Sequence, residues 1–279
     1  MAPDGFNSYE EHVLRKPLTN GSARKTFKVD MTKPMVAQVG RLGSDYDEWV
    51  HQPVKRKECP RLFDSDLLEY FTKCKWWMIP LIWGPVVAWC EAKALAEGLP
   101  VKLLLVAFTE GLLFWTLLEY ILHRWVFHMK ASSATTNKMH YIIHGFHHKH
   151  PMDGDRLVFP PLYTAAICLF LWKLLDLVFS PQWKPSFYGG ALLGYIIYDL
   201  THYFLHFGTP FTNHLYKMKK GHYNHHFKDG NQNYSFGVTS SFWDRVFGTL
   251  QPPPKRTIVP VMRDSRLQEN SNKDDNNAE

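Results

Sequence analysis

The sequences E-Y-I-L-H-R-W-V-F-H (residues 119–128) and H-G-F-H-H-K-H-P (residues 144–151) place histidines where apolar stretches meet polar ones. H-Y-F-L-H (residues 202–206) and H-Y-N-H-H (residues 222–226) repeat the arrangement later in the chain. Neutral imidazole is a good ligand for iron, zinc and copper, and one ion takes at most about six ligands. Because ten imidazoles exceed that number, the pattern predicts two metal ions with about five ligands each. The ten candidate ligands are His123, His128, His144, His147, His148, His202, His206, His222, His225 and His226.

The spacing within these groups indicates which histidines can share an ion. On an α-helix His202 and His206 lie one turn apart and face the same way, as do the outer two histidines of H-Y-N-H-H. The adjacent histidines of each H-x2-H-H group point about 100° apart, so each can serve a different ion. His123 and His128 are five positions apart and do not share a face of a straight α-helix. This spacing predicts that the helix ends or bends between them.

Other polar residues near the histidine groups are candidates for orienting the ligands or the substrate. Glu119 precedes His123 by four positions and Asp199 precedes His202 by three. Such carboxylates are natural partners for the outer ring nitrogen of a ligating histidine, and an unpaired carboxylate in an apolar helix would be costly. The candidates for catalysis or substrate positioning are Asp199, Tyr198, Tyr223 and Asn224, with Tyr195, Asp153 and Arg156 as further candidates.

The remaining five histidines carry weaker signals. His12, His51 and His214 have no comparable neighbours and are expected at the surface. His140 and His150 flank the second group, and the sequence leaves open whether they contact a ligand, bind metal or only pack.

Four apolar blocks lie between the polar segments, and about 20 apolar residues are needed to cross ~30 Å of hydrocarbon. The first block is short and contains Pro80 and Pro85, so a re-entrant hairpin with its neighbour is the alternative for it. The links within each pair of blocks are short, whereas the other polar stretches are rich in Lys and Arg, which favours the cytosol for them. Both termini and all four histidine groups are then expected on the cytosolic face. The blocks are Trp76–Cys90, Val101–Leu122, Pro160–Phe179 and Phe187–Leu205.

The predicted fold is therefore an all-α integral membrane protein. It has about four transmembrane helices and a cytosolic helical cap that holds a histidine-rich dimetal site. The expected divisions are a cytosolic N-terminal segment at 1–70, a membrane-embedded domain with the cap at 71–252, and a disordered C-terminal tail at 253–279.

Composition excludes several other classes for the 279 residues. The net charge of +6 is spread along the polar segments, which does not favour nucleic acid as a partner. Four cysteines without C-x-x-C spacing argue against a disulfide framework or a thiolate metal site. The N-terminus has no apolar core of a cleaved signal peptide, and the absence of H-P-G-G argues against a fused cytochrome b5 domain.

The motifs as a whole resemble those of the fatty acid 2-hydroxylases of sphingolipid metabolism, within the fatty acid hydroxylase and sterol desaturase superfamily. The histidine pattern is shared across that superfamily, whereas P-M-D-G-D-R-L-V-F-P-P (residues 151–161) is much narrower. F-G-V-T-S-S-F-W-D-R-V-F-G-T-L (residues 236–250), K-P-M-V-A-Q-V-G-R-L-G and E-W-V-H-Q-P extend the resemblance over roughly residues 28–250. One departure is Phe207, because many members carry a second histidine directly after the position of His206.

The resemblance implies a multi-pass enzyme of the endoplasmic reticulum membrane with two iron ions, which zinc can replace in purified protein. It implies that 71–252 is a hydroxylase domain that adds oxygen from O2 at C2 of long or very long acyl chains, free or in ceramide. Electrons would come from cytochrome b5 and its reductase, and the chain resembles the plant-type form without a fused b5. Such chemistry needs a redox-active metal, because no side-chain acid or base removes hydrogen from an unactivated methylene.

Other functions remain compatible with the residues alone. A sterol or sphingoid-base hydroxylase or desaturase shares the histidine pattern. A zinc-dependent membrane hydrolase, a receptor with a structural zinc and a haem-binding electron carrier come from other classes. Dependence of activity on O2 and b5 separates the oxidases from a hydrolase, and the lipids that change on deletion separate the oxidases from one another.

Overall fold

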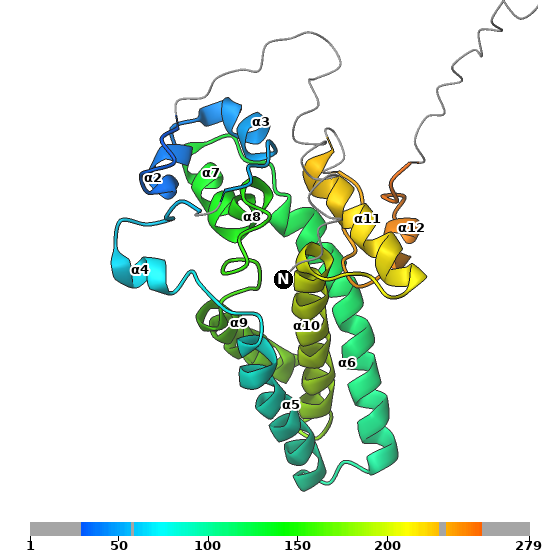
Figure 1. The fold of residues 1–279 in the computed structure, drawn as a ribbon. Helices are drawn as coiled ribbons and strands as arrows, with labels where there is room; N and C mark the ends of the chain where they lie inside the picture. Colours follow the sequence, from blue (N-terminus) through cyan, green and yellow to red (C-terminus); the bar gives the residue numbers. More distant parts are fainter. Residues whose placement is uncertain (1–28, 57–58, 229–232, 253–279) are drawn as a thin grey trace, which may run out of the picture.

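The structure is a computed structural model that describes residues 29–56, 59–228 and 233–252 of the chain (Figure 1). All regular elements in these residues are helices, which confirms the all-α prediction for the described part of the chain. An apolar bundle of long helices carries a cap of short helices at one end (Figure 1). The predicted disordered tail at 253–279 and His12 lie outside the described residues.

The bundle is built from the four apolar blocks. Gly98, with φ of 85°, adopts the left-handed conformation after the first long helix, and Pro100 in extended conformation precedes the second. This tight connection makes the first two helices an antiparallel hairpin. The helices are α5 (Met78–Ala96), α6 (Val101–Ile121), α9 (Pro161–Leu174) followed by the 3-10 turn η4 (Leu175–Leu177), and α10 (Trp183–Phe207).

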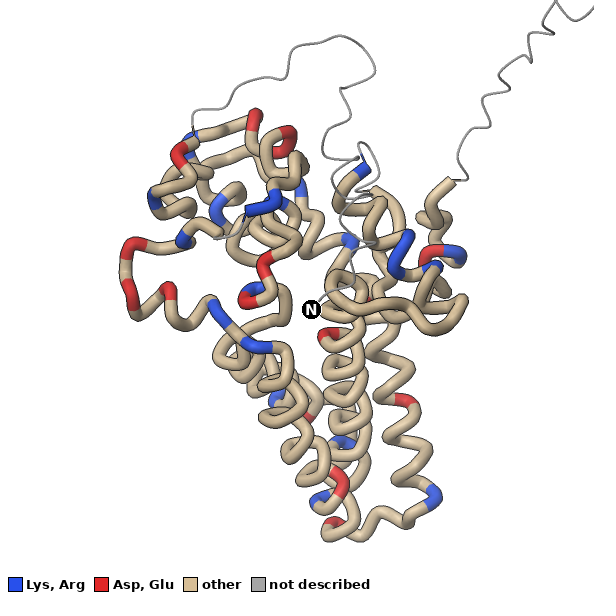
Figure 2. Tube along the Cα trace, in the orientation of Figure 1, with Lys and Arg blue, Asp and Glu red and all other residues tan. Residues whose placement is uncertain are grey.

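Two helices, Met78–Ala96 and Val101–Phe127, are long and apolar enough to cross a membrane. The third expected span is shorter, because α9 has 14 residues and extends about 21 Å. The fourth, α10, has 25 residues but carries Asp199 and two histidines. The number of transmembrane helices therefore stays a prediction. Charged residues are sparse along α5 and α6 and gather in the cap and at the far end of the bundle (Figure 2).

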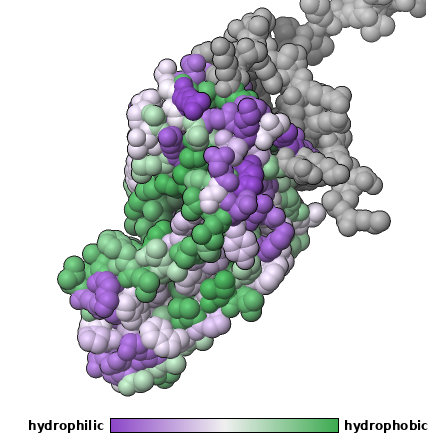
Figure 3. All heavy atoms as spheres, turned by 90° about the vertical axis from the view of Figure 1, so that its left-hand side faces the viewer, coloured by the Kyte–Doolittle hydropathy of each residue, from purple (hydrophilic) through white to green (hydrophobic). Residues whose placement is uncertain are grey.

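The face that carries α4 and α9 is mostly apolar below the cap (Figure 3). Exposed apolar side chains in these two helices include Leu67 and Tyr70 in α4 and Leu169 and Phe170 in α9. Hydrophilic residues concentrate over the cap and at the far end of the bundle. This distribution matches a protein whose middle band faces lipid.

α10 is the central helix of the bundle and packs closely against α6. A Cβ atom at Gly111 would lie 1.8 Å from the Phe187 carbonyl oxygen, and one at Gly190 would lie 1.9 Å from the Phe108 carbonyl oxygen. The two glycines therefore let the helix backbones touch, as small residues do between membrane helices. This contact brings the histidines that follow α6 and those near the end of α10 to the same end of the bundle.

The cap consists of short helices and shares one core with the described part of the N-terminal segment. Met35, Trp49 and Leu62 pack with Tyr141 and Phe146, so both sides of the expected boundary near residue 70 contribute to it. The division at residue 70 remains a prediction. The cap elements are α2 (Met35–Val39), η1 (Gly43–Asp45), α3 (Tyr46–Val50), α4 (Asp66–Tyr70), α7 (Ala134–His140), η3 (Tyr141–Gly145), α8 (Phe146–Lys149), α11 (Asn213–Phe227) and α12 (Phe242–Val246).

Candidate metal centre

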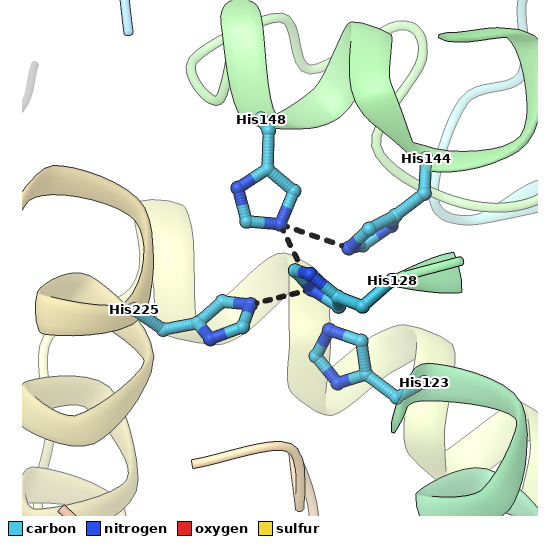
Figure 4. A group of neighbouring side chains, drawn as sticks. All are labelled: His123, His128, His144, His148 and His225. Atoms are coloured by element: carbon cyan, nitrogen blue, oxygen red, sulfur yellow. Dashed lines mark hydrogen bonds between the residues drawn. The ribbon is translucent and has the colours of Figure 1, made fainter. Parts of the chain in front are cut away.

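The ten histidines of the four sequence groups converge at the junction of bundle and cap. In each of two groups of five, one nitrogen per histidine lies within 4.8 Å of all the others. Figure 4 shows the first group, whose rings come from the π-helical turn η2 (Leu122–Phe127) and the residue after it, and from η3, α8 and α11, and point toward a common centre. The first group is His123, His128, His144, His148 and His225, and the second is His147, His202, His206, His222 and His226.

The two groups adjoin, and the adjacent histidines of each H-x2-H-H motif belong to different groups. His147 and His148 separate in this way, as do His225 and His226. The His148 and His226 ring centroids lie 4.4 Å apart across the boundary. The helical spacing of the sequence therefore predicts the partition of these four side chains.

A π-helical turn joins His123 and His128 where the sequence predicts an end or a bend. The segment η2 (Leu122–Phe127) continues α6, and the His128 amide donates to the His123 carbonyl oxygen at 3.1 Å. In a π-helix residues five positions apart lie above one another, so both side chains reach the first group. The expected break is replaced by a local widening of the helix.

The distances within the groups fit metal ligation. Two nitrogens that are each about 2.1 Å from one ion and 90° apart are about 3.0 Å from each other. His148 Nε2 lies 3.2 Å from His128 Nε2 and 3.1 Å from His144 Nε2. In the second group His222 Nε2 lies 2.8 Å from His206 Nε2 and 3.1 Å from His226 Nε2. A single imidazole N–H cannot serve two such neighbours well, whereas a shared cation satisfies every lone pair at once.

Burial keeps the histidines of the cap in the state that a ligand needs. Desolvation, reinforced by neighbouring histidines, lowers the pKa of His144, His147 and His148 well below the usual 6.5. The pKa values of His222 and His226 are lowered for the same reasons. These imidazoles are therefore neutral near pH 7 and offer lone pairs to a cation.

The Nδ1 atoms of two histidines in the first group contact backbone carbonyls. His123 Nδ1 lies 2.5 Å from the Phe236 oxygen, and His225 Nδ1 lies 2.8 Å from the Tyr234 oxygen. These contacts place the proton on Nδ1 and leave Nε2 free to bind. The expectation that Glu119 contacts His123 is wrong, because its carboxylate accepts from the amides of Val238 and Thr239, at 2.8 Å each.

The proposed substrate-positioning residues lie around the second group and the end of α11. The Tyr198 ring stacks on His202 with centroids 5.8 Å apart. Asp199 is buried and accepts from the Phe159 amide at 3.2 Å instead of contacting His202. Asn224 Nδ2 donates to Gln251 Oε1 at 2.7 Å, and the Tyr223 ring stacks on Phe227.

Asp153 and Arg156 form a buried network instead of facing the histidines. Arg156 donates to Asp153 Oδ2 at 2.7 Å and also pairs with Glu69. Both partners are nearly buried, and Glu69 accepts from the amides of Leu62 and Phe63. The network ties the loop after the second histidine group to α4 and to the segment before it, so these two residues hold the cap together. Tyr195 is also occupied locally, since its hydroxyl lies 3.1 Å from Thr164 Oγ1.

His51 is the residue near the centre that the sequence does not reveal. The expectation of a surface position is wrong, because its ring stacks on His128 with centroids 6.2 Å apart and meets the edge of His148 at 5.1 Å. His140 lies behind it and contacts the Tyr46 hydroxyl at 2.6 Å. His150 is buried outside both groups, against Phe146. The W-V-H-Q-P motif of the resemblance was the available signal for His51.

Phe207 lies outside both histidine groups. Its ring packs on Tyr203 with centroids 4.8 Å apart, and the side chain is partly exposed. Position 207, where many members of the resembled family carry a histidine, therefore lies outside both histidine groups.

The fold and the site define a helical protein with apolar membrane-type helices and a histidine-rich centre. A family model described as "Fatty acid hydroxylase" matches residues 108–249. The Arabidopsis thaliana dihydroceramide fatty acyl 2-hydroxylase FAH1 is 49% identical over 224 residues, which cover 80% of this chain and 94% of that protein. The Mus musculus fatty acid 2-hydroxylase is 42% identical over 245 residues, with 80% of this chain and 65% of that protein covered.

A solved structure, that of full-length scs7p with only the hydroxylase domain visible, has a similar fold. Its TM-score is 0.74 at 34% identity, with 91% of this chain and 92% of that chain covered. The chain belongs to the fatty acid hydroxylase family. Membership of this family makes it a lipid-modifying oxidoreductase of the hydroxylase class.

Proposed function

We propose that the chain is a fatty acid 2-hydroxylase that adds oxygen from O2 at C2 of long or very long acyl chains of sphingolipids, free or in ceramide. The observation that carries the proposal is the pair of adjoining five-histidine groups at the end of an apolar bundle. The names of the relatives support the same substrate class, because they are fatty acid and dihydroceramide fatty acyl 2-hydroxylases.

The ten histidines would hold two iron ions, and zinc can occupy the same ligands because imidazole binds both. When bound, a reduced iron pair supplies the O2 activation that hydroxylation of an unactivated methylene requires. One oxygen atom of O2 enters the C2–H bond and the other leaves as water, which takes two electrons and two protons. Cytochrome b5 and its reductase are the proposed electron donors.

The residues of the chain prepare the centre in three ways. Buried imidazoles stay neutral, carbonyls of Tyr234 and Phe236 orient two of them, and the apolar surroundings restrict water.

Among the proposed positioning residues, Tyr198 lies directly against a histidine of the second group. Asp199 would act through the Phe159 amide, by fixing the segment that follows the P-M-D-G-D-R motif. Tyr223 and Asn224 are proposed to line the approach along α11.

The site geometry suits a substrate that lies in a membrane. C2 is next to the polar acyl head, so a centre at the cytosolic end of the bundle meets C2 while the chain lies among apolar helices. We place the enzyme in the endoplasmic reticulum membrane as a multi-pass protein, with the centre and both termini in the cytosol.

The proposal is tested by reconstituting the full chain with reduced b5 and an acyl or ceramide substrate under ¹⁸O2. The expected product carries one ¹⁸O at C2. Products altered only in the sterol or the sphingoid base would favour the other oxidases of the superfamily. Turnover without O2 would favour a hydrolase.

A further inference from the structure

We propose that Asp244 and Glu119 are positioning residues that clamp the segment Tyr234–Thr239 against the first histidine group. The segment overlaps the start of the F-G-V-T-S-S-F-W-D-R-V-F-G-T-L motif (residues 236–250), whose carboxylate Asp244 has no role in the proposed function. The inference rests on the proposed metal centre and assigns these two carboxylates the task of fixing one of its two ion sites.

The segment presents two carbonyls to two ligands. The Tyr234 oxygen lies 2.8 Å from His225 Nδ1, and the Phe236 oxygen lies 2.5 Å from His123 Nδ1. Ser235 between them has φ of 60°, a left-handed conformation that is uncommon for a residue other than glycine. Such a conformation persists only when its surroundings hold it, and here it lies between the two carbonyls that meet the histidines.

Asp244 in α12 holds the segment from one side. Its Oδ1 accepts from the Phe236 amide at 2.9 Å and from Thr249 Oγ1 at 2.8 Å. Its Oδ2 accepts from the Gly237 amide at 2.9 Å. The carboxylate is buried, so these amides have no water to replace it.

Glu119 in α6 holds the segment from the other side, one turn before His123. Its Oε1 accepts from both amides, of Val238 and Thr239, at 2.8 Å, and its Oε2 accepts from Thr239 Oγ1 at 2.7 Å. The helix that carries the ligand His123 therefore also carries the anchor of the loop that orients it. Glu119 thus acts on His123 through the loop that carries the Phe236 carbonyl instead of by direct contact.

The carbonyl contacts of the segment reach the first group alone, at His123 and His225. The Nδ1 atoms of His147, His222 and His226 in the second group, like that of His148 in the first, are buried and have no hydrogen-bond partner among the described residues. The clamp therefore belongs to the first group, and its loss should weaken one ion site more than the other.

Asp244→Asn is the direct test, because the variant keeps the side-chain volume but replaces one acceptor oxygen by a donor. At least one of the Phe236 and Gly237 amides or the Thr249 hydroxyl then loses its acceptor. Loss of an outer partner typically weakens metal binding 10–100-fold. The full chain is purified in detergent, loaded with Zn²⁺ and titrated with a chelator, and bound zinc per chain is measured by mass spectrometry.

The wild type should hold two ions, and Asp244→Asn should release one of them at roughly 10–100-fold lower chelator concentration. In a His222→Ala background, where only the first group is intact, Asp244→Asn should weaken the remaining ion. In a His225→Ala background it should leave the remaining ion unchanged.

Glu119→Leu and Glu119→Gln give the second measurement. Leucine accepts no hydrogen bond, so Glu119→Leu should release the same ion at a lower chelator concentration than the wild type does. Glutamine keeps Oε1 for both amides and can donate to Thr239 Oγ1, so Glu119→Gln should behave like the wild type. If Asp244→Asn does not fold, this pair decides the proposal.

Glu69→Gln is the matched control, because Glu69 also accepts from two successive amides, those of Leu62 and Phe63, but at a distance in sequence from the clamp. It should lower stability and keep both ions as tightly bound as in the wild type. Unchanged zinc binding in Asp244→Asn and Glu119→Leu would overturn the clamp while leaving the proposed centre intact. A wild type that binds no zinc would overturn the centre itself.

Discussion

His147 and His148 are neighbours in the sequence and belong to different histidine groups. Replacing each of them separately therefore tests the division of the ten histidines into two groups. His147→Ala and His148→Ala should each reduce bound metal from two ions to about one per chain. Hydroxylation should fall by more than the 10–100-fold that loss of an outer partner causes, because a direct ligand is lost. Metal analysis and the reconstituted assay measure both effects.

His150→Ala is the control for these variants, because His150 is as deeply buried but lies outside both groups. It should lower stability yet retain two ions. Loss of an ion in His150→Ala, or two ions in both ligand variants, would contradict the partition.

His140 predicts a pH dependence of stability. Burial lowers its pKa from 6.5 to about 4. Between these two pH values the imidazole is therefore protonated in the unfolded chain and neutral in the folded chain. Its contribution is therefore present above pH 6.5 and is lost as pH falls toward 4, by about 3 kcal/mol. Unfolding of metal-free wild type and His140→Gln should be measured from pH 7 to pH 4. The wild type should lose more free energy of unfolding, and parallel curves would contradict the assignment.

For single residues, the sequence predicts which histidines gather, because their number and spacing are typical of metal ligands. It does not predict the position of His51, which reaches the first group only through packing of the N-terminal segment on the cap. It also mistakes the partners of Glu119 and Asp199, since proximity along a helix does not reveal backbone amides brought in by distant loops.

At the element scale the contact between α6 and α10 depends on glycine. Gly190→Ala should destabilise the fold by roughly 1–3 kcal/mol, because the added methyl group would meet the Phe108 carbonyl and neither helix backbone can move aside freely. Gly84→Ala in α5 is the control, since nothing lies within 4 Å of its added Cβ. Thermal unfolding in detergent should show a lower midpoint for Gly190→Ala alone, and equal midpoints would contradict the packing.

The boundaries of α6 agree with the apolar block within one residue. A long apolar stretch between two polar links forms a single helix, so the links mark its ends. The π-helical turn η2 lay beyond sequence reasoning, since regular α-helical periodicity cannot align residues five apart. The length of α9 was overestimated because hydropathy alone does not show where a helix gives way to a turn.

For the whole molecule, four membrane-crossing helices predict which side of the membrane each link between helices lies on. Gly98 and Gln182 lie in the links at the far end of the bundle, whereas His214 lies at the end that carries the histidine groups (Figure 1). Single cysteines at these positions, in a background without the native cysteines, should react with a membrane-impermeant reagent from opposite sides. Cytosolic labelling at 182 would contradict a complete fourth crossing and indicate a re-entrant pair of α9 and α10.

In the proposed function, ten histidines hold two iron ions that add oxygen at C2 of an acyl chain. The most direct test measures iron per chain and the position of ¹⁸O in the product, in the same preparation reconstituted with reduced b5 under ¹⁸O2. We predict two ions per chain and one ¹⁸O at C2. An active preparation with no bound metal, or a product that carries oxygen from water, would contradict it.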